Sequence, residues 1–94
     1  LMTMLPIQWK VEAQEDLTVI LTYIAQRNRP AALQPYNDID NAISQLPNHP
    51  HLYRTGRVIG TRELLAHPNH VVVYRVDASA IEILAVMHTR QLYP

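Results

Sequence analysis

The chain has 94 residues, no cysteine, two glycines, seven prolines and a formal net charge of zero. This length fits one domain, residues 1–94, and the missing cysteines exclude a disulfide framework, thiolate chemistry and a cysteine-ligated zinc site. A neutral domain is also a poor candidate for sequence-independent nucleic-acid binding, because such binding depends on many Lys and Arg contacts to phosphate.

The N-terminal residues predict a strand followed by a helix. Apolar and polar residues alternate over residues 5–11 (LPIQWKV), which is typical of a half-buried strand. From Ala13 the spacing becomes helical, with an apolar face made by Leu17, Ile20, Leu21 and Ile24. We expect Asp16 in the first turn of this helix and Asn28 at its end.

A second helix is predicted after Pro30. Its apolar stripe consists of Ala32, Tyr36, Ile39, Ile43 and Leu46. Pro35 conflicts with a continuous helix, because a proline inside a helix removes a backbone hydrogen bond at a cost of ~3 kcal/mol. Either the helix kinks at this proline or its first turn is separate. The two helices would be antiparallel, joined by residues 27–30.

Three strands are predicted in the C-terminal third, after a proline-containing loop at residues 46–55. They cover residues 61–66, 71–76 and 81–87, with turns at residues 67–70 and 77–80. Short turns between consecutive strands indicate an antiparallel meander. The fold class is therefore α+β, in the order β-α-α-β-β-β, with two antiparallel helices packed on a small, mainly antiparallel sheet.

Cofactor and metal sites are not indicated. Gly56 and Gly60 are the two glycines, too few for a phosphate-binding loop or a dinucleotide fingerprint. The histidine pairs His49/His51 and His67/His70 have no carboxylate at ligand spacing, so we expect solvated loop histidines. We therefore expect no cofactor and no metal.

Charge is distributed unevenly along the chain. Residues 1–47 hold three basic and five acidic residues, whereas residues 48–94 hold five arginines, three acidic residues and all five histidines. We therefore expect anion binding or acid–base chemistry in the second half. Its candidates are Arg62, Glu63, Tyr74, Arg75, His88, Arg90 and Tyr93.

Adjacent strands could bring several of these candidates to one sheet face, where a base, an arginine and an acid could cleave RNA. Structural roles are favoured for most of them. We expect Tyr74 in the core, and Trp9 packed on a helix rather than forming a binding platform. Arg62 beside Glu63, and Arg75 opposite Glu82 or Glu63, are expected as surface pairs worth ~1 kcal/mol or less. His88, at a strand end, is the most plausible titrating group.

Three blocks in the C-terminal third resemble the ParE branch of the RelE/ParE toxin superfamily. They are GRVIGTREL (residues 56–64), VVYRV (72–76) and ILAVMHTRQ (83–91), followed by Tyr93 and Pro94. Trp9, Asp16 and Tyr23 agree with the family as well, so the resemblance covers essentially the whole chain. It implies the fold derived above and a growth-inhibiting toxin of a bacterial type II toxin–antitoxin pair.

The resemblance also implies a cytoplasmic location and a cognate antitoxin as partner, whose disordered C-terminal segment would wrap around the toxin. An apolar groove with a basic rim would suit that segment. It implies no direct DNA binding by the toxin alone, and we expect no membrane contact. Residues that bind the antitoxin are not assigned.

The superfamily has two activities. RelE-like members are ribosome-dependent mRNA endoribonucleases, and many carry an arginine where this chain has Val71 and Val72. ParE-like members poison DNA gyrase. The missing arginine and the zero net charge favour gyrase inhibition, without enzymatic activity, over RNA cleavage or another toxic target. We expect target contacts from Arg62, His88, Arg90 and Tyr93, which would be the catalytic set of an RNase.

Overall fold

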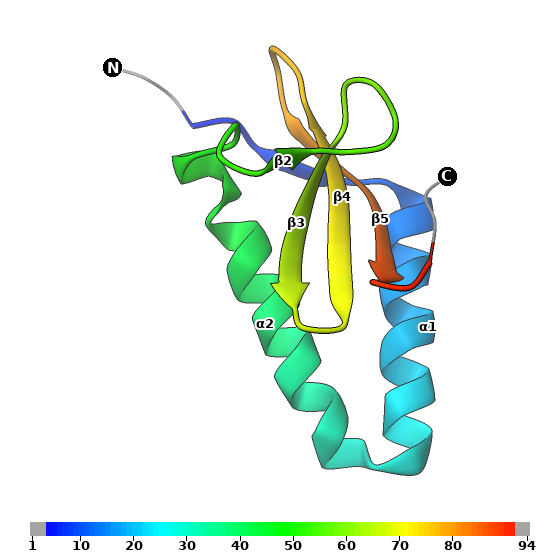
Figure 1. Ribbon diagram of the computed structural model, residues 1–94. Helices are drawn as coiled ribbons and strands as arrows, with labels where there is room; N and C mark the ends of the chain where they lie inside the picture. Colours follow the sequence, from blue (N-terminus) through cyan, green and yellow to red (C-terminus); the bar gives the residue numbers. More distant parts are fainter. Residues whose placement is uncertain (1–3, 92–94) are drawn as a thin grey trace.

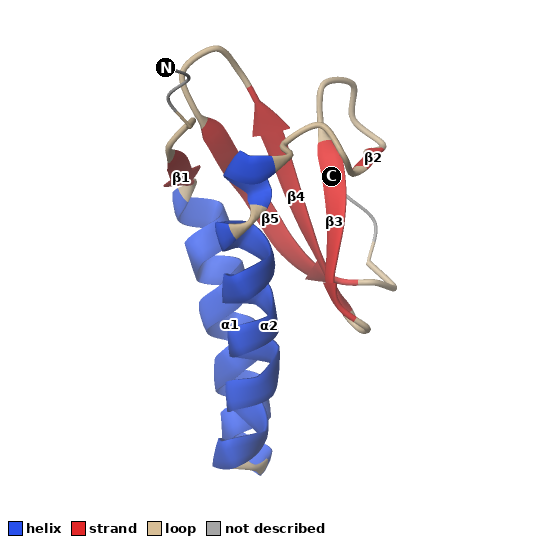
Figure 2. Cartoon of the chain, turned by 90° about the vertical axis from the view of Figure 1, so that its left-hand side faces the viewer, coloured by secondary structure: helices blue, strands red, loops and turns tan. Residues whose placement is uncertain are grey.

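Two helices cover one face of a five-stranded sheet in the computed structural model, which describes residues 4–91 (Figures 1 and 2). The elements are β1 (Ile7–Trp9), α1 (Val11–Arg27), α2 (Leu33–Ser44), β2 (Arg54–Thr55), β3 (Arg62–His67), β4 (His70–Val76) and β5 (Ile81–His88). The strand order is β1-β5-β4-β3-β2, in which β1 runs parallel to β5 and the other pairs are antiparallel. The predicted α+β class and the mainly antiparallel sheet are therefore confirmed.

The first strand is shorter than the alternating pattern predicted. The Lys10 N–H donates to the Ile83 carbonyl at 2.9 Å, and α1 then begins at Val11 with Lys10 as its N-cap. Val11 is exposed in the first helical turn and does not continue the strand's buried face. Asp16 consequently lies in the second turn of α1, not in the first.

Pro35 is accommodated because the segment before it forms a turn of its own. Arg29–Ala32 is a short 3₁₀ turn, and α2 begins after it at Leu33. Pro35 then lies within the first turn of α2, where the backbone N–H groups have no intrahelical acceptor and a missing one is harmless. Of the two alternatives left open by the sequence, the separate first turn is correct.

The three long strands agree with their predicted bounds to within one residue at each end, whereas β2 was not predicted. Its two residues pair with the start of β3, and a periodic pattern is not visible in so short a strand. All of residues 70–74 in β4 are buried, as predicted for a central strand that is apolar on both faces. The register between β4 and β5 shifts between Val73 and Tyr74, so that Leu84 of β5 has no partner in β4 and forms a bulge.

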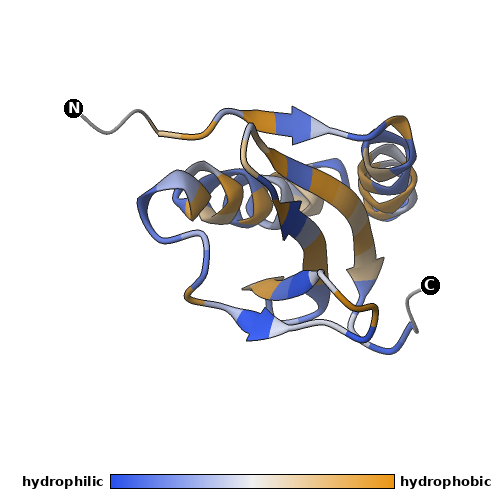
Figure 3. Cartoon of the chain, turned by 90° about the horizontal axis from the view of Figure 1, so that it is seen from above, coloured by the Kyte–Doolittle hydropathy of each residue, from blue (hydrophilic) through white to orange (hydrophobic). Residues whose placement is uncertain are grey.

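The main core lies between the helices and the sheet, where hydrophobic segments of both layers meet (Figure 3). Tyr74 is at its centre with no exposed surface, as predicted, and its hydroxyl donates to the Pro50 carbonyl at 2.8 Å. Trp9 is half-buried and packs against the same core. A second, smaller apolar cluster on the opposite sheet face contains Val71, Val73 and Ala85. No helix within residues 4–91 is long and apolar enough to cross a membrane.

Candidate functional site

The polar residues proposed from the sequence do not gather at one place. Arg62 on β3 pairs with Tyr74, whereas His88 on β5 pairs with His70, four residues away along β4. At a rise of about 3.3 Å per residue, the backbones of Arg62 and His88 are separated by roughly 13 Å along the strand direction. Tyr93 lies outside the described residues. The structure therefore gives no joint site for Arg62 and His88.

Arg62 holds the loop that precedes β2. Its Nη1 donates to the carbonyl of His51 at 3.1 Å and to the carbonyl of Tyr53 at 2.7 Å. The expected Arg62–Glu63 pair is wrong, because consecutive residues of a strand point to opposite faces. Glu63 instead forms an ion pair with Arg54 of β2, at 3.0 Å between Nη2 and Oε1.

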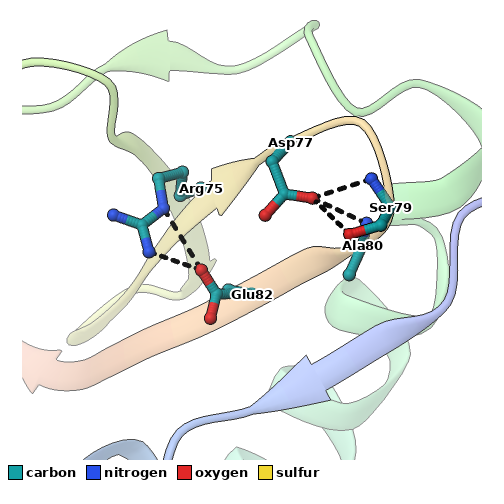
Figure 4. Close-up of polar contacts among 5 residues, drawn as sticks. All are labelled: Arg75, Asp77, Ser79, Ala80 and Glu82. Carbon is teal, nitrogen blue, oxygen red and sulfur yellow. Dashed lines mark hydrogen bonds and ion pairs between the residues drawn. The ribbon is translucent and has the colours of Figure 1, made fainter.

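The expected pair between Arg75 and Glu82 is confirmed (Figure 4). Arg75 Nε donates to Glu82 Oε1 at 3.2 Å, on the sheet face opposite the helices. The neighbouring turn is closed by Asp77, whose Oδ1 accepts from the N–H groups of Ser79 at 2.8 Å and Ala80 at 2.9 Å. These hydrogen bonds, that of the Ser79 N–H first, lower the pKa of Asp77.

Three histidines form a row across the ends of β3, β4 and β5, and we call them the histidine row: His67, His70 and His88. The Nδ1 atoms of His67 and His70 lie 3.3 Å apart, and the ring centroids of His70 and His88 are 5.8 Å apart. His67 Nδ1 also accepts from the Asn69 N–H at 3.2 Å, so His70 is the Nδ1–H donor of the pair. The expectation of solvated loop histidines is wrong for His70, which is buried in β4.

Burial lowers the pKa of His70, and the neighbouring His67 and His88 lower it further. The histidine row could be foreseen only in part from the sequence. A two-residue turn places His67 and His70 side by side, but the register of β5 is needed to bring His88 beside them. Among residues 4–91 no three metal-ligating side chains are placed to hold a metal ion.

The chain turns back on itself directly after β5. His88 Nδ1 accepts from the Arg90 N–H at 3.1 Å, and the His88 N–H donates to the Gln91 side-chain oxygen at 2.7 Å. The Arg90 side chain is exposed next to this turn. His88 and Arg90 are therefore close in space, and the hydrogen bond between them is made by the Arg90 backbone N–H.

A groove of about 370 Å³ runs between α1 and the histidine row. We call it the helix groove, and its lining residues are Val19, Ile20, Tyr23, Ile24, Asn69, His70 and His88. Arg27 stacks over the Tyr23 ring at 4.5 Å from its centroid, which adds a positive charge to one wall. The groove is therefore mainly apolar, with one arginine beside one of its walls, a feature that periodicity alone did not reveal.

A larger cavity of about 560 Å³ lies beside β5, between the start of α1 and the loop that joins β2 and β3. One side is lined by β5, while α1 contributes Glu12 and Asp16 and the loop contributes Val58 and Ile59. The protein therefore has two different hollows, a groove between α1 and the histidine row and a cavity between α1 and this loop.

The sequence and fold are both similar to those of known toxins. Residues 7–93 match the family described as ParE toxin of type II toxin–antitoxin system, parDE. The chain is 36% identical over 89 residues to Y4kP of Sinorhizobium fredii, and the match covers 94% of this chain and 92% of that protein.

Two solved structures share the fold. One is the chromosomal ParDE system from P. aeruginosa, with a TM-score of 0.78 and 24% identity over 90% of this chain and 96% of that one. The other is the E. coli DinJ–YafQ toxin–antitoxin complex, with a TM-score of 0.64 and 13% identity over 98% of this chain and all of that one. At these identities the structural likeness shows the fold alone.

Proposed function

The chain belongs to the ParE toxin family of type II toxin–antitoxin systems, and we propose that it stops growth by inhibiting DNA gyrase. The observation that carries this proposal is the dispersal of the residues an RNase would need. Arg62 is engaged by two loop carbonyls and lies on a different part of the sheet from His88. Stabilising a pentavalent phosphate requires an arginine within hydrogen-bond reach of it, close to the base and the acid.

Net charge supports the same proposal. The chain carries eight basic and eight acidic residues, so it has no excess of cations for docking into ribosomal RNA. A protein target makes no such demand, because protein interfaces depend on apolar anchors and local charge complementarity. We propose that the toxin acts in the cytoplasm by contacting the enzyme, without binding DNA itself.

A cognate antitoxin is the second partner that we propose. The comparison structures from P. aeruginosa and E. coli are named as toxin–antitoxin systems, and this chain shares their fold. The helix groove offers apolar walls, with the Arg27 guanidinium stacked on the Tyr23 ring beside them. Such a surface suits an acidic, disordered segment that folds as it binds, because apolar burial offsets the ordering entropy.

Ribosome-dependent mRNA cleavage remains the second candidate, and one observation favours it. His88 and Arg90 lie together at the end of β5, with Arg90 exposed to solvent. A histidine and an arginine in one turn could supply a proton donor and an anion-binding group, with Tyr93 three residues further along the chain.

The two activities are separated by assaying the purified toxin with gyrase, relaxed plasmid and ATP. We expect the toxin to prevent the introduction of negative supercoils or to make cleaved plasmid accumulate. We expect the His88→Ala/Arg90→Ala variant to fold like the unchanged chain. Codon-specific cuts in translated mRNA, mapped by primer extension, together with unchanged supercoiling would overturn gyrase inhibition. Loss of those cuts in the double variant would then assign the two residues to catalysis.

A further inference from the structure

The loop between β2 and β3, residues 56–61, is held closed by hydrogen bonds, and we call it the display loop. The Gly56 N–H donates to the Thr61 carbonyl at 2.8 Å, and the Thr61 N–H donates to the Val58 carbonyl at 3.1 Å. The Thr61 hydroxyl donates to the same Val58 carbonyl at 2.6 Å, and Thr61 itself is buried. Two backbone hydrogen bonds and one side-chain hydrogen bond, all of them made by Thr61, therefore hold the loop in this conformation.

Both glycines of the chain serve this conformation. A Cβ atom at Gly56 would collide with the Thr61 hydroxyl oxygen. Gly60 has a φ of +86°, a backbone conformation that side chains disfavour. The GRVIGTREL block of the sequence is thus accounted for by the construction of a preformed loop, and not by a phosphate-binding or catalytic role.

The display loop presents an apolar side chain to solvent. Ile59 is 100% exposed and Val58 is 37% exposed. The loop projects from the sheet on the side away from the helices (Figures 1 and 2) and borders the 560 Å³ cavity. A rigid loop loses little conformational entropy on association, so burial of Ile59 against a partner would be converted efficiently into affinity.

Two arginines lie at the start of the display loop, Arg57 within it and Arg54 in the strand β2 just before it. Arg57 is an exposed loop residue, and the Arg54 side chain is 69% exposed although it pairs with Glu63. Both also line a small hollow next to β3 and the end of β5. A partner that receives Ile59 would therefore meet positive charge around it, and carboxylates would be complementary there.

We propose that Ile59 is an anchor that inserts into an apolar pocket, edged by carboxylates, on the folded protein that this toxin inhibits. The proposal rests on the function proposed above. A convex, preformed loop fits a pocket that already exists, which a folded partner has. An antitoxin segment that folds on binding needs a concave surface instead, and the helix groove on the other side of the sheet provides one.

The test compares Ile59→Asp with Leu52→Asp in the gyrase supercoiling assay. Leu52 is 67% exposed and lies outside the display loop, so it is a matched apolar-to-acidic control. We expect a roughly 10- to 100-fold higher inhibitory concentration for Ile59→Asp, from the loss of one buried isoleucine. For Leu52→Asp we expect less than a twofold change. Thr61→Val, which removes the hydroxyl that closes the loop, should give an intermediate loss with Ile59 intact.

The outcomes separate the two proposals. If Ile59→Asp and the unchanged chain inhibit gyrase equally, Ile59 is not the anchor, and gyrase inhibition itself is supported. If the unchanged chain does not inhibit gyrase, gyrase inhibition is overturned, and the anchor is tested by growth arrest instead. Weaker arrest by Ile59→Asp than by the unchanged chain supports the anchor, and equal arrest overturns it. A variant that arrests growth fully but escapes neutralisation by the co-encoded antitoxin would assign Ile59 to the antitoxin and contradict the proposal.

Discussion

His70 is buried among the ends of the long strands, and burial lowers its pKa. His67 faces it from β3 and His88 from β5, while α1 contributes the titratable Tyr23 to the adjoining groove. Because the pKa of His70 is lowered, the folded protein binds fewer protons than the unfolded chain just below the ordinary histidine pKa of about 6.5. The stabilising contribution of neutral His70 is therefore complete above that pKa and is lost as the pH falls.

We expect the free energy of unfolding to decrease between pH 7 and pH 5, and to decrease less in His70→Gln. Glutamine does not titrate, and its amide can still donate to His67 Nδ1. Urea denaturation at both pH values measures the difference, with the exposed His51→Gln as control. If the free energy of unfolding decreases equally in His70→Gln and the unchanged chain between these pH values, His70 is not the cause of the pH dependence.

Tyr74 makes a second prediction at the scale of one residue. Burial raises the pKa of Tyr74 to about 12, so its hydroxyl stays a donor to Pro50 throughout the neutral range. Tyr74→Phe leaves that carbonyl unpaired and should cost about 1 kcal/mol of stability. The half-exposed Tyr36→Phe should cost almost nothing in the same urea denaturation. An equal cost for the two variants would mean that the hydrogen bond contributes little.

At the scale of elements, the contact between α1 and β5 explains how the sheet edge is protected. Within residues 4–91, β1 pairs with the first three residues of β5 and no other strand lies along the rest of that edge. Asp16 of α1 fills part of the gap, because its Oδ2 accepts the Val86 N–H at 3.0 Å. A carboxylate at this point satisfies an N–H group that would otherwise be open for pairing with another chain.

Asp16→Ala should therefore destabilise the protein by about 1–3 kcal/mol, because the part-buried Val86 N–H loses a charged acceptor. Faster hydrogen exchange at the Val86 amide would accompany the loss. Glu15→Ala, an exposed neighbour on the same helix, is the control and should change neither quantity. If the two variants unfold at the same urea concentration, the carboxylate does not stabilise β5.

The sequence predicts elements well where a pattern is long. Both helices and the strands β3, β4 and β5 follow from periodicity and turn residues, because each buries a continuous face. The junction at Val11 was misplaced, since one more apolar residue fits either a strand or a helix start. The two-residue strand β2 and the ion pair of Glu63 with Arg54 depend on register between separate strands, which residue order does not reveal.

The candidate site was predicted less well than the fold, for the same physical reason. His88 and Arg90 are close in sequence and remain close in space. Arg62 was expected near them because adjacent strands can align, but the observed register places it beside Tyr74 instead. The contact of Asp16 with Val86 joins residues 70 positions apart, so only the folded chain shows it.

On the scale of the whole molecule, the sheet separates two surfaces with different shapes. The helix groove is concave and lies beside α1, whereas the display loop is convex and lies on the opposite side (Figure 2). A toxin that must be held by an antitoxin and must also reach a target can use one surface for each. The neutral net charge fits two protein partners better than it fits RNA.

The most direct test of gyrase inhibition is the topoisomer distribution of a reporter plasmid in cells, followed in the first minutes after toxin induction. Gels containing chloroquine resolve the topoisomers. Gyrase inhibition predicts that negative supercoiling falls before translation slows, while mRNA from the same samples stays uncut. Plasmid supercoiling that stays constant while codon-specific mRNA fragments accumulate would contradict the account.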